Sequence, residues 1–211
     1  MVENQYAGKL IAIDGPNGAG KSTIINGLKN RLAQDNILSY FTKEPSESDI
    51  GEFTRKYAET NSGLSLACLV GADRYFHLET EIIPQLKAGC FVFSDRYILS
   101  SLILQGIDGV HPSLICKINE NVIKPDLQIV VWASEETLQD RLKGRDVLTR
   151  FEKGQRSREE LEFMKAGVVI LEELGTECIH IYTDRNLDDN IEYIVKCALD
   201  LGERNERFHS H

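Results

Sequence analysis

The stretch IAIDGPNGAGKST, residues 11–23, decides the fold. It continues an apolar run that begins at Lys9 and stops at Gly15, as a buried strand does. From Lys21 to Gln34, apolar residues recur at the spacing of one helical face. Between these two segments, GPNGAGKS matches the pattern G-x-x-x-x-G-K-[ST] of a phosphate-binding loop. The sequence therefore predicts a strand, a glycine-rich phosphate loop and a helix in direct succession.

Each residue type of this loop has a task. The glycines let backbone N–H groups turn toward a phosphate, and the start of the following helix adds its dipole. Lys21 is expected to neutralise the outer phosphates, and Ser22 is expected to offer its hydroxyl to Mg²⁺. We therefore expect ATP with Mg²⁺ as the cofactor. The residues expected to bind it are Gly15, Asn17, Gly18, Ala19, Gly20, Lys21, Ser22 and Thr23.

The overall charge and the cysteines restrict the partners and the compartment. The chain carries 33 acidic and 24 basic residues, a formal net charge of -9, whereas a nucleic acid or an anionic membrane calls for a broad basic surface. No apolar run approaches the length of a membrane-spanning helix. The five cysteines are odd in number and form no C-x-x-C pair. We expect a cytoplasmic protein with buried, unpaired thiols that binds neither nucleic acid nor membrane.

Apolar runs and helical stretches alternate along the rest of the chain. Further strands are expected at residues 38–41, 91–94, 127–132 and 178–182. Helices are expected at residues 65–88, with a kink at Pro84, and at 112–123, 135–143 and 187–201. This alternation predicts an α/β fold of the P-loop NTPase type, with a five-stranded parallel sheet sandwiched by helices. Loops at the carboxyl edge of the sheet would then meet in one crevice.

A polar, arginine-rich segment, residues 144–160, lies between two of the helical stretches. Transfer of a phosphoryl group between two nucleotides needs cations on a part of the chain that closes over the phosphates and excludes water. We expect this segment to be a mobile lid with Arg145 and Arg150 as its functional arginines, the alternative being a solvated charged surface. The chain is expected to form a single domain, residues 1–204, with a polar C-terminal tail at 205–211.

The sequence FVFSDRY, residues 91–97, indicates what kind of nucleotide protein this is. Asp95 falls at the end of a buried strand, within reach of a metal ion held by Ser22. Arg96 stands where an ATP-driven motor would often carry a glutamate that activates water, and an arginine fits a second phosphate instead. The guanine-reading stretch N-K-x-D of GTPases is absent from the sequence. We therefore expect phosphoryl transfer to a second nucleotide, with Ser22 and Asp95 at the metal ion.

Together these motifs resemble the thymidylate kinase family of P-loop nucleoside monophosphate kinases. The resemblance runs through nearly the whole chain and rests on GPNGAGKST, TKEPSESDIGEFTR (42–55), GADR (71–74), SDRYILSSLILQG (94–106), KPDL (124–127) and TRFE (149–152). It implies transfer of the ATP γ-phosphate to a nucleoside monophosphate, with dTMP giving dTDP as the expected reaction. It also implies five parallel strands, a lid and a homodimer formed through helices.

Matched residue by residue, the resemblance implies two sets of site residues. The expected catalytic residues are Lys21, Asp95, Arg96, Arg145 and Arg150. The residues expected to bind the acceptor are Asp14, Lys43, Glu44, Pro45, Val70, Arg74, Arg96, Ser100, Ser101, Leu104 and Gln105. The phosphate loop has no arginine at Gly18 or Ala19, which resembles the bacterial subtype that supplies its catalytic arginine from the lid.

Several departures from the family pattern cluster on the acceptor pocket. Val70 stands where the family has a phenylalanine, and Leu104 stands where it has a tyrosine. Asn17 replaces an acid and Lys43 an arginine, and Ser46 and Glu47 replace a pair of glycines. Three alternatives to dTMP phosphorylation therefore stay open. The chain could phosphorylate another pyrimidine or modified nucleotide, or a deoxynucleoside hydroxyl with Asp14, Glu44 or Asp95 as base. It could also bind nucleotide without transferring phosphate.

Overall fold

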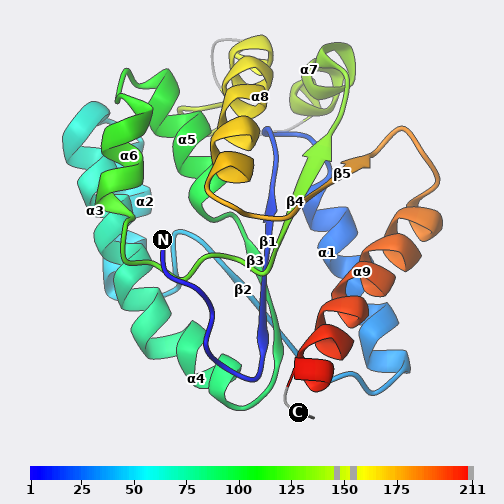
Figure 1. Ribbon diagram of the computed structural model, residues 1–211. Helices are drawn as coiled ribbons and strands as arrows, with labels where there is room; N and C mark the ends of the chain where they lie inside the picture. Colours follow the sequence, from blue (N-terminus) through cyan, green and yellow to red (C-terminus); the bar gives the residue numbers. More distant parts are fainter. Residues whose placement is uncertain (145–147, 153–155, 209–211) are drawn as a thin grey trace.

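The computed structural model describes residues 1–144, 148–152 and 156–208, and for 203–208 only the backbone (Figure 1). Five strands form one sheet in the order β2-β3-β1-β4-β5, with every neighbouring pair parallel. The strands are β1 (Lys9–Asp14), β2 (Ser39–Lys43), β3 (Phe91–Asp95), β4 (Leu127–Trp132) and β5 (Cys178–Tyr182). The predicted α/β fold with a five-stranded parallel sheet is confirmed.

Helices cover both faces of this sheet (Figure 1). The helices are α1 (Lys21–Gln34), α2 (Asp49–Ala58), α3 (Gly63–His77), α4 (Ile83–Lys87), α5 (Ile98–Ile107), α6 (Pro112–Ile118), α7 (Glu135–Lys143), α8 (Ser157–Glu173) and α9 (Leu187–Phe208), and a π-helical segment, η1 (Leu78–Ile82), joins α3 to α4. One core packs α1, α7 and α9 against the sheet, and the other packs α3 to α6 and α8. None of the helices in the described ranges is both long and apolar enough to cross a membrane.

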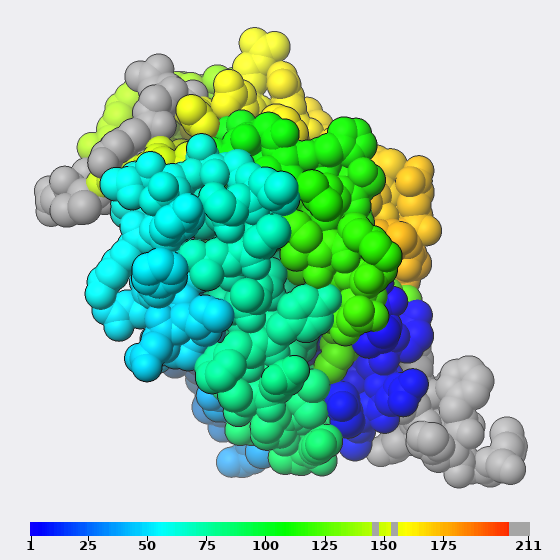
Figure 2. Space-filling model, turned by 90° about the vertical axis from the view of Figure 1, so that its left-hand side faces the viewer, coloured from blue at the N-terminus to red at the C-terminus, as the bar shows by residue number. Residues whose placement is uncertain are grey.

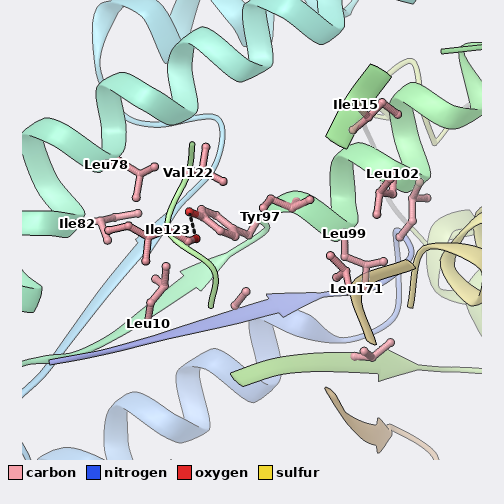
Figure 3. Packing of buried hydrophobic residues seen from close by; sticks show 14 of the residues in the cluster. Leu10, Leu78, Ile82, Tyr97, Leu99, Leu102, Ile115, Val122, Ile123 and Leu171 are labelled. Atoms are coloured by element: carbon pink, nitrogen blue, oxygen red, sulfur yellow. Dashed lines mark hydrogen bonds between the residues drawn. The ribbon is translucent and has the colours of Figure 1, made fainter. Parts of the chain in front are cut away.

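The core formed by α3 to α6 and α8 includes Tyr97, which lies two residues after the carboxyl end of β3. Tyr97 is fully buried and donates a hydrogen bond to Ile123 O at 2.8 Å (Figure 3). Around it Figure 3 shows Leu10 of β1 together with Ile82 and Val122, all of them fully buried. This packing holds the start of α5 against β1, which fixes the position of the residues at the ends of both β1 and β3.

Several predicted boundaries were wrong. The helix expected at 65–88 is divided into α3, η1 and α4, and Pro84 lies in the first turn of α4. The helix expected at 112–123 ends at Ile118. Helix α9 runs to Phe208, into the residues expected to form a tail. Of the expected lid, α8 already includes residues from Ser157 on, and 145–147 and 153–155 lie outside the described residues.

Helices α2, α5 and α8 were not among the predicted helices. Helix α2 begins after Ser48, whose side chain accepts a hydrogen bond from Gly51 N at 3.2 Å. The sequence showed the resemblance of this stretch to a family but no apolar run long enough to predict a helix. All five cysteines are free thiols, as expected. The expectation that they are buried holds only for Cys90, since Cys116, Cys178 and Cys197 are half-buried and Cys68 is exposed.

The strand order explains where a ligand site can form. Strands β1 and β3 are neighbours, and the chain continues from β1 into α1 on one face of the sheet and from β3 into α5 on the other face. A crevice opens at such a point, beyond the carboxyl ends of the strands. The phosphate loop follows β1, Arg96 follows β3 and Glu44 follows β2 at this same edge. The fold therefore brings three of the predicted motifs together.

Candidate active site

The phosphate loop is closed around Lys21. The Lys21 ammonium donates to Gly15 O and Pro16 O, both at 2.9 Å, and the side chain is nearly buried. Gly18 and Gly20 have φ angles of 82° and 99°, a region open to glycine and costly for other residues. The loop thus holds a cation beneath a run of backbone N–H groups, the arrangement that binds a phosphate chain.

Burial lowers the pKa of Lys21 from 10.5 to about 7, and repulsion from Arg96 adds to this, while Asp95 and Asp14 act against it.

A bound polyphosphate favours the charged Lys21 ammonium and so raises its pKa again. At pH 8, a group with a pKa of about 7 is about nine-tenths deprotonated, so binding of Mg·ATP should take up close to one proton. At pH 6 the uptake should fall to on the order of one tenth of a proton. Calorimetric titration in buffers of different ionisation enthalpy measures this number, and Lys21→Arg, which stays charged, should abolish the uptake at pH 8.

Asp95 and Arg96 end β3 directly beside the loop. Arg96 has a φ angle of 76°, which is strained for a residue with a side chain, and its N–H donates to Ile13 O at 2.9 Å. This conformation directs its guanidinium to Asn17 Oδ1 at 2.7 Å and to Ser100 Oγ at 3.1 Å. Strain of this kind persists where the surrounding structure fixes it, as it does at binding sites.

The residues at the end of β3 fit a divalent cation. Asp95 Oδ1 is buried and has no hydrogen-bond partner within the described part of the chain, although Asp95 lines the same cavity as Ser22. Mg²⁺ prefers oxygen ligands and takes most of them from phosphates and water in nucleotide sites. The described residues contain no group of three or more carboxylates, histidines or cysteines that could hold a metal alone, as expected for a site of that kind.

Glu160, in the first turn of α8, is a member of the site that the sequence did not reveal. Its carboxylate is buried and accepts from Asn17 N at 2.6 Å and from Asn17 Nδ2 at 3.1 Å. Asn17 in turn accepts from Arg96. The acid that the family carries at position 17 is thus absent from the loop, but a carboxylate from α8 is bonded to the residue that replaces it.

This pairing gives a sharp prediction for stability. Glu160→Gln turns an amide NH₂ toward the Asn17 amide and loses charge-assisted hydrogen bonds, so it should lower the free energy of unfolding by about 1–3 kcal/mol. Asn17→Asp sets two carboxylates against each other and should also destabilise. The double variant restores one amide and one carboxylate and should recover most of the loss, whereas additive effects would contradict the pairing. Urea unfolding of the four proteins at pH 7 measures the coupling.

At the other end of the site, Arg74 of α3 is held by four acceptors. It donates to Glu44 Oε2 at 2.8 Å, to Asn119 Oδ1 at 2.6 Å, to Ser101 Oγ at 3.0 Å and to Tyr97 O at 3.1 Å, and its side chain is 1% exposed. The loop after β2 is fixed as well, because Ser46 N and Oγ donate to the buried Asp73 at 2.8 and 2.6 Å. Ser46 therefore has a defined structural role where the family pattern has a glycine.

One cavity of about 730 Å³ joins the two ends of the site. The predicted residues that line it are Asn17, Gly18, Gly20, Lys21, Ser22, Thr23, Glu44, Pro45, Val70, Arg74, Asp95, Arg96, Ser100, Leu104 and Gln105. The predicted residues that do not line it are Asp14, Gly15, Ala19, Lys43, Ser101 and Arg150. Arg145 lies outside the described residues. The volume is in the range of small-molecule sites, and the lining extends from the phosphate loop to α3 and α5.

Three of the predicted residues that do not line the cavity, Asp14, Lys43 and Arg150, have partners elsewhere. Asp14 is fully buried and accepts from the backbone N–H groups of Tyr97 and Ser100, both at 3.0 Å, which ties β1 to α5. Lys43 is exposed and pairs with Glu47 at 2.8 Å. Arg150 donates to Asp108 and to Ala58 O, so its guanidinium is turned away from the phosphate loop in this structure. Its role on the transferring phosphate stays a prediction.

Three arginines that were not selected from the sequence do line the cavity. Arg55 of α2 donates to Pro45 O at 2.6 Å and reaches the acceptor end. Arg141 of α7 donates to Gly18 O and Ala19 O, both at 3.2 Å, beside the phosphate loop, and Arg185 follows β5. Arg55 ends the motif TKEPSESDIGEFTR, and that position was the available signal. Nothing in the sequence distinguished Arg141 from its arginine neighbours.

Comparison with known proteins agrees with this geometry. The family model described as thymidylate kinase matches residues 13–194. A "Thymidylate kinase" from Caldicellulosiruptor saccharolyticus is 33% identical over 205 residues, which cover 92% of this chain and 97% of the relative. A "Probable thymidylate kinase" from Caldivirga maquilingensis is 40% identical over 147 residues, 68% of this chain and 72% of the relative. Another, from Pyrobaculum aerophilum, is 35% identical over 145 residues, 67% of this chain and 73% of the relative. The match of the family model across most of the chain, together with these relatives, shows that the chain belongs to the thymidylate kinase family.

Proposed function

We propose that this protein transfers the γ-phosphoryl group of Mg·ATP to dTMP and so forms dTDP. The observation that carries the proposal is the single cavity that extends from Lys21 to Arg74 and Gln105, with Asp95 and Arg96 between its ends. In the proposed complex, two nucleotides bind in this cavity phosphate to phosphate. Membership of the thymidylate kinase family supports dTMP as the acceptor.

In the proposed mechanism, the donor phosphates lie on the loop N–H groups and on the Lys21 ammonium. A Mg²⁺ held by Ser22 and Asp95 would neutralise charge on the transferring group. Arg96 is placed to hold the acceptor phosphate, since its guanidinium lies between Asn17 and Ser100 at the head of the loop. An acceptor phosphate oxygen attacks the γ-phosphorus in line and needs little help from a base, while the bond from the γ-phosphorus to the bridging oxygen breaks and ADP leaves. Catalysis is then mainly positioning and charge neutralisation.

The two bases would occupy opposite ends of the cavity. Leu66, Val70 and Leu104 form an apolar wall next to Gln105, whose side-chain amide can hydrogen-bond a base edge. At the donor end, Arg141 donates to Thr183 Oγ1 at 3.1 Å, and both line the cavity. We propose that the donor base lies against these two residues.

The test is an acceptor panel of dTMP, dUMP, UMP, CMP, dCMP and thymidine, each with Mg·ATP, with ADP and the phosphorylated product followed together. We expect the highest kcat/KM for dTMP. A higher value for another monophosphate would redirect the assignment to that nucleotide, and a higher value for thymidine would mean transfer to a hydroxyl. Formation of no product from any acceptor would leave nucleotide binding without transfer. An enzyme of these substrates works where the nucleotide pools are, which supports a cytoplasmic location.

We also propose that the protein is a homodimer. Helix α3 exposes Leu64, Cys68, Ala72 and Phe76 in one stripe at intervals of four residues, and Leu114 of the neighbouring α6 is exposed too. Figure 2 shows the face on which these two helices lie. An apolar stripe of this kind commonly marks an interface. Light scattering should give twice the chain mass of 23.8 kDa, and Phe76→Glu should give the monomer.

A further inference from the structure

Arg150 fastens residues 148–152 to the ends of two helices at the acceptor end of the cavity. Its Nη1 and Nη2 atoms donate to the two carboxylate oxygens of Asp108 at 2.8 and 2.7 Å, and its Nε donates to Ala58 O at 2.6 Å. The side chain of Asp108 is 3% exposed. Because a bidentate arginine pair is directional, this segment is held in one orientation.

The two attachment points adjoin residues that line the acceptor end. Asp108 caps the last turn of α5, which carries Leu104 and Gln105, and Ala58 is the last residue of α2. Ala58 itself lines the cavity. The segment is therefore placed over the region where the base of the acceptor would lie, and its arginine is bonded at a distance from the phosphate loop.

The residue that follows, Phe151, lines the cavity. The guanidinium carbon of Arg150 lies 4.1 Å from the centre of the Phe151 ring, so the arginine that fixes the segment also fixes the ring. Among the described residues that line the cavity, Phe151 alone is aromatic. Leu66, Val70 and Leu104 line the same cavity with aliphatic side chains.

We propose that Phe151 supplies the aromatic face on which the base of the acceptor nucleotide stacks, and that Arg150 and Asp108 are positioning residues which hold it there. This inference rests on the proposed function, because it concerns the acceptor of the same reaction. A ring provides a flat, polarisable surface to any base, and each such stack contributes substantially to nucleotide affinity. Phe151 thus offers the acceptor an aromatic ring, whereas Val70 stands where the family has its phenylalanine.

The first test replaces the ring and measures binding directly. Phe151→Leu should raise both the Kd for dTMP and the KM for dTMP about tenfold. The Kd is measured by calorimetry in the absence of ATP. The KM for ATP should change less than twofold. Phe151→Tyr keeps the ring and should stay within about twofold of the unmodified protein. Phe53→Leu is the matched control, because Phe53 is 56% exposed on α2 and does not line the cavity. Equal weakening of dTMP and ATP by Phe151→Leu, or no weakening, would overturn the assignment.

The second test separates positioning from chemistry at Arg150. If Arg150 anchors the segment, Arg150→Met and Asp108→Asn should each raise the KM for dTMP several-fold with a much smaller change in kcat. If Arg150 instead acts on the transferring phosphate, Arg150→Met should lower kcat about a hundredfold while Asp108→Asn does not, and the anchoring role falls. Should the unmodified protein neither bind nor phosphorylate dTMP, the proposed function fails together with this inference. Should it do both while Phe151→Leu matches it, the inference alone fails.

Discussion

Lys21→Ala is expected to lower kcat by about a thousandfold while the protein stays folded. The Lys21 ammonium is held by carbonyl groups of the phosphate loop, at 2.9 Å from Gly15 O and Pro16 O. In the proposed reaction it moves to the donor phosphates, where charge on the transferring group grows toward the transition state. A preorganised cation at such a place contributes mainly to kcat, since the stabilisation is greatest in the transition state.

The stability of the free protein should not fall in Lys21→Ala, although kcat does. Burial holds the pKa of Lys21 at about 7, far below 10.5, so the charged ammonium disfavours the folded state without ligand at pH 7 and below. Its removal should leave the melting temperature unchanged or raise it. Steady-state kinetics with dTMP and circular-dichroism melts measure the two effects. Lys29→Ala, an exposed lysine two turns further along α1, is the control and should change neither. An unchanged kcat in Lys21→Ala would contradict the proposed mechanism.

The sequence was sufficient for the parts of the fold that depend on local pattern. Residues 11–23 combine an apolar strand, a glycine loop and a helix start, and each of these signals is contained in a few neighbouring residues. The same holds for Asp95 and Arg96, because their position follows from the end of an apolar run. Parallel strands bring such ends together at one edge of the sheet, so a cavity around Lys21 can be expected from the sequence alone.

The parts that could not be predicted depend on contacts between distant residues. Glu160 is 143 residues away from Asn17 in sequence, and only the packing of α8 against the loop brings the two together. Arg150 was selected as an arginine in a polar segment, but the orientation of its guanidinium is decided by Asp108 and Ala58, 42 and 92 residues away. Charge in a segment therefore predicts that cations are present, whereas the partner of each cation is a property of the tertiary structure.

Arg74→Met is expected to cause the largest loss of stability, about 3–5 kcal/mol. The Arg74 side chain is 1% exposed and satisfies the carboxylate of Glu44, which is itself 4% exposed. Methionine fills part of the volume but removes the arginine from the buried Glu44 carboxylate, which keeps only the His77 ring, at 3.5 Å, as a cationic partner among the described residues. Asn119 and Ser101 lose their donor as well. For a chain of this size, such a loss corresponds to a fall in melting temperature of about 10 °C. Activity with dTMP should fall as well, since both Arg74 and Glu44 line the cavity.

The comparison with other variants shows whether the cost comes from the unpaired carboxylate. Arg74→Lys should recover little, because one ammonium cannot reproduce a fork that reaches four acceptors. Glu44→Gln combined with Arg74→Met should cost less than the sum of the two single changes, since removal of the carboxylate removes the uncompensated charge. Arg31→Met is the control: Arg31 also pairs with two carboxylates, Asp35 and Glu192, but in solvent, so its urea midpoint should move far less. Equal shifts of the urea midpoint for Arg31→Met and Arg74→Met would show that burial of the Arg74 cluster does not determine its contribution to stability. The expected difference would show that the acceptor end of the cavity is stabilised by one desolvated arginine, Arg74.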